Sequence, residues 1–202
     1  MGNKNWIHHP TELIGKAVKL IPLNTFHFEE ICTLAKEKSI WTYSPIGVDG
    51  YDNQTHIGFL EKCIMKRNSG EFYPFVVILC KTDKVIGFTI YHSINNENRS
   101  LEIGCTWFHP DYWSTNLNTE CKYLMLKHCF ETLETIRIQL KANDNNIRSR
   151  KAIEKIGGKF EGILRKDKIL EDVTIRNAAY YSIIDDEWVS VKVNLMKVLN
   201  FS

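Results

Sequence analysis

The sequence predicts an α/β fold built on one mixed, mostly antiparallel β-sheet of about seven strands, and two patterns carry this prediction. First, three apolar segments at 72–80, 85–94 and 101–108 follow one another with short polar turns between them, as in an antiparallel meander. Second, a helical pattern at 117–133 lies between the third segment and another apolar segment at 136–142. A helix that joins two strands of one sheet makes a right-handed crossover, so these two strands should run parallel.

The N-terminal third supplies one more strand and two helices. Segment 13–23 has the alternation of a strand. Asn24 or Thr25 can then cap a first helix, and a second helix is expected over about 54–68 because its apolar residues recur at helical spacing. These helices precede the meander in the chain.

The C-terminal part supplies a helix, two strands and a final helix. Asn145 or Asn146 can cap the first of these helices. Strands at 159–164 and 174–184 flank a charged turn. The last helix, at 185–199, opens with acidic residues, which the positive end of a helix dipole favours.

Composition narrows the class of protein. With 202 residues, 44% of them hydrophobic, the chain fits a single domain spanning 1–202, in which residues 1–12 are either an arm or a packed lead-in. Lys and Arg number 26 against 24 Asp and Glu, so no basic field points to nucleic acid or a membrane as partner. The six cysteines include no C-x-x-C pair, which favours reduced thiols and a cytoplasmic protein, and no metal site is predicted.

The turn between strand 101–108 and the following helix is the first candidate site. It reads Trp113-Ser114-Thr115-Asn116-Leu117-Asn118. Amides at a helix N-terminus, together with the helix dipole, favour an anion such as a phosphate group. Glycines usually stand where backbone must approach a phosphate, and here they are absent.

Three sequence segments carry a family resemblance: L-I-G-K-A-V-K-L-I-P-L, L-E-I-G-C-T-W-F-H-P-D-Y-W and N-I-R-S-R-K-A-I-E-K-I-G-G-K-F-E-G-I-L-R. Together with the order of elements, they resemble the GNAT superfamily of N-acetyltransferases, and more closely its ribosomal-protein (RimJ/RimL-like) branch. The resemblance extends over roughly residues 13–188. It implies a three-layer fold with helices on both faces of the sheet, a splayed central parallel pair of strands, and acetyl-CoA as the coenzyme.

The same resemblance implies where the coenzyme binds. The pantetheine arm would lie where strands 101–108 and 136–142 splay apart. Backbone amides near Cys105, Thr106 and Trp107 would hold the thioester carbonyl and stabilise the oxyanion formed when an amine attacks. The pyrophosphate would be bound by the turn and helix start, formed by Trp113, Ser114, Thr115, Asn116, Leu117, Asn118 and Thr119.

This turn departs from the family pattern. The pyrophosphate loop usually reads Gln or Arg, two residues, Gly, one residue, then Gly or Ala, whereas Asn116 and Asn118 occupy the two small positions here. Asparagine can adopt a left-handed backbone conformation and can cap a helix, so the loop should still present its amides. Alternatively, the asparagines only cap the helix and coenzyme binding is weakened.

A second departure concerns the general acid. Asn146 and Ser149 match the N-x-x-S of the branch, in which the Asn contacts the pantetheine and the Ser lies near the sulfur. Many relatives place a tyrosine four residues after that serine, where this chain has Ile153. Ser149 is therefore the candidate acid or hydrogen-bond donor, or else a first-turn hydroxyl. Arg148, on the same helix start, could meet coenzyme phosphates.

The remaining candidates concern the acceptor. Glu102 and Glu161 are candidate general bases, and each could equally be a structural carboxylate. Trp41 and Tyr43 could form a wall of the acceptor cleft or simply pack between two helices. We interpret Cys105 as a packing residue because transfer in this family is direct.

Three functions are consistent with these observations. The first is acetyl-CoA-dependent acetylation of an α-amino group of a protein or peptide. The second keeps the chemistry but uses a small amine, such as a polyamine, amino acid or aminoglycoside, as acceptor. The third is a non-catalytic acyl-CoA-binding or protein-interaction module. Relatives in this family are often dimers, so a homodimer is an assembly that the resemblance allows.

Overall fold

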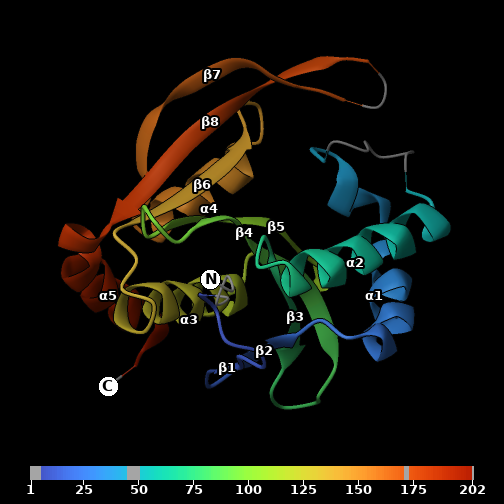
Figure 1. The fold of residues 1–202 in the computed structure, drawn as a ribbon, viewed down its shortest axis with the longest axis horizontal. Helices are drawn as coiled ribbons and strands as arrows, with labels where there is room; N and C mark the ends of the chain where they lie inside the picture. The colour runs from blue at the N-terminus through green and yellow to red at the C-terminus, as the bar shows by residue number, and fades with distance from the viewer. Residues whose placement is uncertain (1–5, 45–50, 171–172, 202) are drawn as a thin grey trace.

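The computed structural model describes residues 6–44, 51–170 and 173–201, and its centre is an eight-stranded sheet. The strand order is β1-β2-β3-β4-β5-β6-β8-β7 (Figure 1). Neighbouring strands are antiparallel except β5 and β6, which are parallel, as the helical crossover between them predicted. The strands are β1 (Leu13–Ile14), β2 (Val18–Pro22), β3 (Tyr73–Leu79), β4 (Val85–Asn95), β5 (Ser100–Phe108), β6 (Arg137–Asn143), β7 (Lys159–Ile169) and β8 (Ile175–Ile184).

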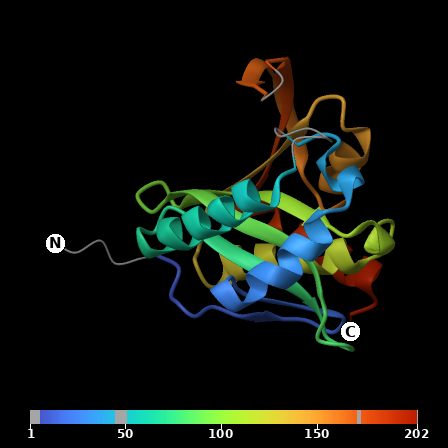
Figure 2. The same ribbon diagram turned by 90° about the vertical axis from the view of Figure 1, so that its right-hand side faces the viewer.

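Helices cover both faces of this sheet, which confirms the predicted three layers (Figure 2). Side chains of α1 and α2 share one apolar core with alternate residues of β3 and β4. Side chains of α3, α4 and α5 share the other core, on the opposite face. The helices are α1 (Phe28–Ala35), α2 (Asn53–Asn68), α3 (Leu117–Glu131), α4 (Ile147–Lys155) and α5 (Asp185–Leu199).

The predicted first strand is divided in two. Instead of one strand across 13–23, β1 and β2 form a hairpin that turns at Gly15, so the sheet has one strand more than expected. The carboxylate of Glu120, on α3, accepts hydrogen bonds from the backbone N–H groups of Lys16 (2.5 Å) and Ala17 (2.8 Å). Because these N–H groups bond to a side chain, they do not continue a strand ladder.

The second difference is the β7–β8 hairpin, which is longer than predicted. Residues 166–169, expected in a charged turn, belong to β7 and pair with β8 as far as Ile169 opposite Ile175. Tyr180 donates a hydrogen bond to Asp167 across the hairpin (3.0 Å). Charged residues are compatible with an exposed two-stranded ribbon because both of its faces can meet water. The hairpin projects beyond the rest of the sheet (Figure 1).

The described part of the N-terminal segment packs against the body of the protein. Ile7 is buried in the core beneath β3, and the backbone N–H of Thr11 donates to the hydroxyl of Tyr73 (2.7 Å). Of the two alternatives for this segment, residues 6–12 therefore form a packed lead-in. Within the described ranges, no helix is long and apolar enough to cross a membrane.

Candidate active site

A gap in the centre of the sheet forms the candidate site. β5 and β6 pair only at Ser100–Arg137, Leu101–Ile138 and Glu102–Gln139, and beyond these pairs the strands separate. This is the splay that the family resemblance implied. Backbone N–H and C=O groups facing a gap in a sheet need partners, so the gap is suited to a ligand rich in amides.

A β-bulge in β5 adjoins the gap. Phe88 pairs with Trp107 and Ile90 with Gly104, so the two residues Cys105 and Thr106 stand opposite one residue of β4. Cys105 has a left-handed backbone conformation with φ of +48°. An extra residue bends a strand locally and changes the direction of its amides. The bulge therefore lies where the thioester carbonyl was expected.

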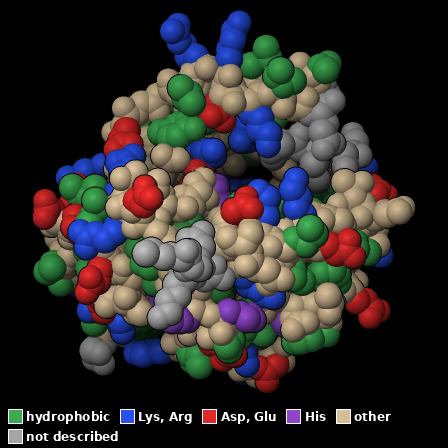
Figure 3. Space-filling model, viewed as in Figure 1, with side chains coloured by type: hydrophobic (Ala, Val, Ile, Leu, Met, Phe, Trp, Pro, Cys, Tyr) green, Lys and Arg blue, Asp and Glu red, His purple; other side chains and the backbone are tan. Residues whose placement is uncertain are grey.

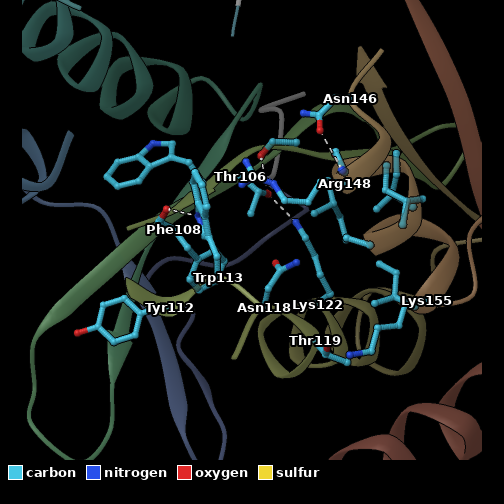
Figure 4. Close-up of a pocket in the computed structure, with 18 of the residues that line it drawn as sticks. Thr106, Phe108, Tyr112, Trp113, Asn118, Thr119, Lys122, Asn146, Arg148 and Lys155 are labelled. Carbon is cyan, nitrogen blue, oxygen red and sulfur yellow. Dashed lines mark hydrogen bonds between the residues drawn. The ribbon is translucent and has the colours of Figure 1, made fainter. Parts of the chain in front are cut away.

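The separated strands and two helix starts enclose a cleft of about 370 Å³. All the predicted coenzyme-binding residues line it except Asn116 and Leu117. Figure 4 shows side chains from β5, α3 and α4 converging on this space. The predicted residues in the lining are Cys105, Thr106, Trp107, Trp113, Ser114, Thr115, Asn118, Thr119, Asn146, Arg148 and Ser149.

The start of α3 is built differently from the sequence prediction. Asn116 is right-handed (φ −81°) and makes no capping hydrogen bond. The left-handed residue is Ser114 (φ +59°), and the hydroxyl of Thr115 accepts a hydrogen bond from the N–H of Leu117 (3.3 Å). Asn116 instead accepts a hydrogen bond from Lys155, the last residue of α4 (3.1 Å), so it joins the start of α3 to the end of α4. Because serine has a Cβ, this left-handed conformation costs about 1–2 kcal/mol, which the surrounding structure must offset.

Asn118 tests whether these residues fit coenzyme A. It lines the cleft, and its amide oxygen is buried without a hydrogen-bond partner among the described residues. A buried acceptor of this kind needs a donor, and the pantetheine N–H groups of coenzyme A supply one. The N-terminus of α3, where helix N–H groups lack partners within the helix, adds an anion site beside it. The residues present therefore fit the coenzyme.

The start of α4 forms the opposite wall. The side-chain oxygen of Asn146 accepts a hydrogen bond from the N–H of Ser149 (3.0 Å), which confirms the predicted cap. Ser149 lines the cleft at the first turn of α4. Arg148 stacks over the ring of Trp113 and so joins this wall to the turn before α3.

Lys122, on α3, is a cleft residue that sequence reasoning did not select. It is buried, and its Nζ donates to the hydroxyl of Thr106 (2.5 Å), next to the bulge (Figure 4). Burial lowers the pKa of its ammonium group to about 8. The available signal was its spacing: a residue four positions after Asn118 shares that residue's helix face.

Glu102 lies beside the cleft, at the last paired position before the strands separate. It is buried, and its carboxylate accepts a hydrogen bond from Gln139 (2.8 Å) and lies near Lys141 (3.7 Å). The ring of His92 is 3.4 Å away, and burial lowers the pKa of this histidine. Because side chains alternate along a strand and both sequence neighbours of Glu102 lie in the α3–α5 core, Glu102 faces the α1–α2 side.

Glu161 lies outside the cleft, so the structure does not place this candidate base near the reaction centre. Its carboxylate forms two hydrogen bonds with Arg137 (2.7 and 2.6 Å) and accepts a third from Ser182 (2.7 Å). The hydrogen bonds from Arg137 are the main cause that lowers its pKa, to about 2. A carboxylate held in this way is a weak base.

Neither residue of the predicted acceptor wall, Trp41 or Tyr43, lines the cleft. Trp41 is buried, donates to the carbonyl of Ala35 (2.7 Å) and stacks with Tyr51, so the packing interpretation holds for it. Tyr43 is exposed, and its carbonyl accepts a hydrogen bond from Arg176 of β8 (3.4 Å). This segment therefore contacts the β7–β8 hairpin.

Cys105 is open to the cleft, but surrounding protein raises the pKa of its thiol, first by desolvation. A thiol of this kind is mainly protonated at neutral pH and is a poor nucleophile. Across the described ranges, no cluster of His, Cys, Asp and Glu could hold a metal ion.

The fold and the cleft define an acyltransferase of the coenzyme A-dependent type, and the family comparison identifies it. The family model described as "Acetyltransferase (GNAT) domain" matches residues 18–159, and the chain belongs to this family. It is similar to YnaD of Bacillus subtilis (strain 168), an uncharacterized N-acetyltransferase, with 26% identity over 173 residues that cover 84% of this chain and 96% of YnaD.

Two solved structures extend the comparison. A GCN5-related N-acetyltransferase from Brucella melitensis has 25% identity and a TM-score of 0.84, over 94% of this chain and 86% of that one. RimJ of Mycobacterium smegmatis, solved with CoA-disulfide, has a TM-score of 0.81 over 95% of this chain and 96% of that one. Its identity of 18% shows the shared fold alone.

Proposed function

We propose that this acetyltransferase transfers the acetyl group of acetyl-CoA directly to an α-amino group at a protein or peptide N-terminus. The observation that carries the coenzyme assignment is the cleft between β5 and β6, which begins at the α3 helix start and ends at the bulge. The third hypothesis, a non-catalytic module, is less well supported because the chain belongs to a family of acetyltransferases.

The charges beside the cleft support a peptide acceptor over a polycation. Lys141 lines the cleft, and the β7–β8 hairpin carries Arg165, Lys166, Lys168 and Arg176. Figure 3 shows a hollow below this hairpin with several Lys and Arg side chains, and also Asp or Glu side chains, at its border. Positive groups repel polyamines and aminoglycosides, whereas a single amino group on a neutral or acidic peptide is tolerated.

The relatives add support for the same acceptor class. YdaF of Bacillus subtilis (strain 168), provisionally assigned as a ribosomal N-acetyltransferase, is 29% identical over 106 residues, which cover 52% of this chain and 57% of YdaF. The exposed apolar side chains Ile163, Leu164 and Ile169 on β7 give a peptide further contacts.

Five residues at or beside the cleft have proposed roles in this reaction. The backbone at Cys105 and Thr106 binds the thioester carbonyl, and amides that point at a developing negative charge lower the barrier. Glu102 receives the proton that the attacking amine must lose. Ser149 donates a hydrogen bond to the sulfur, and Asn146 fixes the helix start that holds Ser149 in place.

An acetyl-CoA consumption assay over peptides and small amines tests this proposal. Peptides with free N-termini should be acetylated at the α-amino group, as mass spectrometry would show, and the same peptides with blocked N-termini should not react. Turnover of polyamines or aminoglycosides instead would support the small-amine alternative. Binding of acetyl-CoA without any turnover would support the non-catalytic module, and no binding of any coenzyme A ester would overturn both catalytic hypotheses.

Variants test the individual roles in the same assay. Ser149→Ala should lower kcat about tenfold or more, and Asn118→Ala should weaken coenzyme binding. Ser190→Ala, which removes an exposed hydroxyl on α5, is the matched control and should behave like the wild type. Full turnover by Ser149→Ala would remove Ser149 from the mechanism.

A further inference from the structure

Lys122 is a buried cation without an ion-pair partner among the described residues. Its side chain extends from α3 into the cleft, where Nζ contacts two hydroxyls, Thr106 at 2.5 Å and Thr89 at 3.5 Å. Each lies on a strand that forms the bulge. Burying an ammonium group without an anion is unfavourable, so a lysine in this position calls for a negative charge that arrives with a ligand.

The position of Nζ indicates which part of the ligand carries this negative charge. The anion site for the pyrophosphate is the start of α3, at Ser114–Asn118, one helical turn before Lys122. Nζ reaches past this turn to Thr106, the residue after Cys105 in the bulge. Under the proposed function, the thioester lies at the bulge, and negative charge appears there only during the reaction, on the carbonyl oxygen and then on the sulfur.

We propose that Lys122 is a catalytic residue that donates a proton from Nζ to the coenzyme A thiolate as it leaves. The amine nitrogen forms a bond with the acetyl carbon, and the C–S bond breaks with its electron pair on sulfur. The Nζ–H bond then supplies the proton that makes the free thiol, while the proton of the amine passes to Glu102. Lys122, left neutral, regains a proton from solvent, and Glu102 releases the proton of the amine to solvent. This inference rests on the proposed function.

The surroundings of Lys122 allow it to donate this proton near neutral pH. Burial holds the pKa of its ammonium group at about 8, which lies close to the ordinary pKa of a thiol. Thr106 and Thr89 hold Nζ in place without offering it a carboxylate that would raise that pKa. Titratable and charged groups that face Nζ or share the cleft are Cys121 on α3, Cys105 on β5, His92 on β4, Lys141 on β6, and Arg148 and Lys155 on α4.

These neighbours do not titrate in the same range. Burial raises the pKa of both Cys105 and Cys121, the latter to about 11, and lowers the pKa of His92. Near pH 8, Lys122 is therefore the group expected to change charge beside the sulfur. The rate constant kcat should fall as pH rises through about 8, because the proton donor is lost.

Replacement of Lys122 tests the proposal through kinetics. Lys122→Met keeps the length of the side chain and should lower kcat about 100-fold, with the alkaline decrease abolished and KM for acetyl-CoA changed much less. Lys122→Arg keeps the positive charge but releases its proton poorly, so its kcat should also stay low. Lys127→Met, an exposed position of the same helix, is the control and should match the wild type. Wild-type kcat in Lys122→Met, or full recovery in Lys122→Arg, would overturn the proposal.

A binding measurement tests it without turnover. An ammonium group beside the sulfur should lower the thiol pKa of bound coenzyme A by about one unit, seen as thiolate absorbance in an ultraviolet difference titration. The titration is made first on the wild type. Desulfo-coenzyme A, which has no thiol to titrate, serves as the blank. Lys122→Met should lose the shift yet bind desulfo-coenzyme A normally, which shows that it is folded. An unshifted thiol pKa of coenzyme A bound to the wild type would overturn the role of Lys122 alone. A failure to bind coenzyme A would overturn the proposed function as well.

Discussion

The guanidinium of Arg148 lies 3.6 Å from the centroid of the Trp113 ring, stacked upon it. Trp113 is itself fixed, because its indole N–H donates to the carbonyl of Phe108 at the end of β5 (2.8 Å). The stack therefore connects α4, the turn before α3 and β5 across one end of the cleft (Figure 4). Stacking of this kind contributes about 0.5 to 2 kcal/mol.

Loss of this stack should weaken coenzyme binding. Arg148→Met removes both the stack and a positive charge at the cleft, so we expect the Kd for coenzyme A to rise about tenfold. Isothermal titration calorimetry measures this directly. Lys151→Met, on the exposed face of the same helix, is the control. An unchanged Kd for Arg148→Met would show that the stack is structural only.

Cys105 should be dispensable for catalysis. Transfer is direct, and the raised pKa of this thiol opposes a nucleophilic role. We expect Cys105→Ala to keep kcat within about threefold of the wild type. Intact-protein mass spectrometry after incubation with acetyl-CoA, without acceptor, should find no acetylated enzyme. Acetyl on Cys105, with loss of turnover in the variant, would establish a two-step mechanism instead.

Glu120 should be important for folding and not for chemistry. Its carboxylate binds the N–H groups of the β1–β2 turn from inside the protein, so Glu120→Ala leaves buried donors unpaired and should lower the free energy of unfolding by about 3 kcal/mol. Gly15→Ala should also destabilise, because an added Cβ would collide with this carboxylate and with the carbonyl of Val18. Denaturant titration measures both, with exposed Glu61→Ala as control. Wild-type stability in Glu120→Ala would contradict this role.

The Arg137–Glu161 pair should contribute to stability in a defined pH range. The folded-state pKa of Glu161 is about 2, below its ordinary value of 4.5, so its contribution is present above about pH 4.5 and is lost as pH falls through about 2. Because both side chains are about two-fifths exposed, solvent screening limits the effect to about 1 kcal/mol.

Comparison of Glu161→Gln with the wild type measures this contribution. The variant should be less stable at neutral pH by that amount, and the difference should disappear near pH 2. Glu61→Gln, on the exposed surface of α2, serves as control. A difference that persists at low pH would mean that packing, and not charge, accounts for the loss.

Elements with strong local signals were predictable from the sequence. α5 begins and ends at the predicted residues 185–199 because acidic residues open it and its apolar residues recur at helical spacing. Asn146 caps α4 as expected, and the parallel arrangement of β5 and β6 followed from the crossover rule. The coenzyme residues on β5 and α4 came from the family resemblance, and the structure brings them together at one cleft.

Features that depend on distant residues were not predictable. The β1–β2 turn is fixed by Glu120, which is 104 residues from Lys16 in the chain. Glu161, a candidate base in the sequence, is paired with Arg137, which is 24 residues away in the chain. At the start of α3, the intrinsic preference of asparagine favoured a left-handed backbone conformation for Asn116. The residue is right-handed instead, and it bonds to Lys155. Each of these errors concerns a side chain whose partner is supplied by tertiary structure.

Within the sheet, the five N-terminal strands and the three C-terminal strands are joined only by the short β5–β6 ladder at Glu102 and the two residues before it. The sheet is therefore two sub-sheets connected by one short ladder. A ligand whose amides pair with both sub-sheets would act as a second connection between them. Its binding energy would then add to the free energy of unfolding, so thermal stability would itself report occupancy.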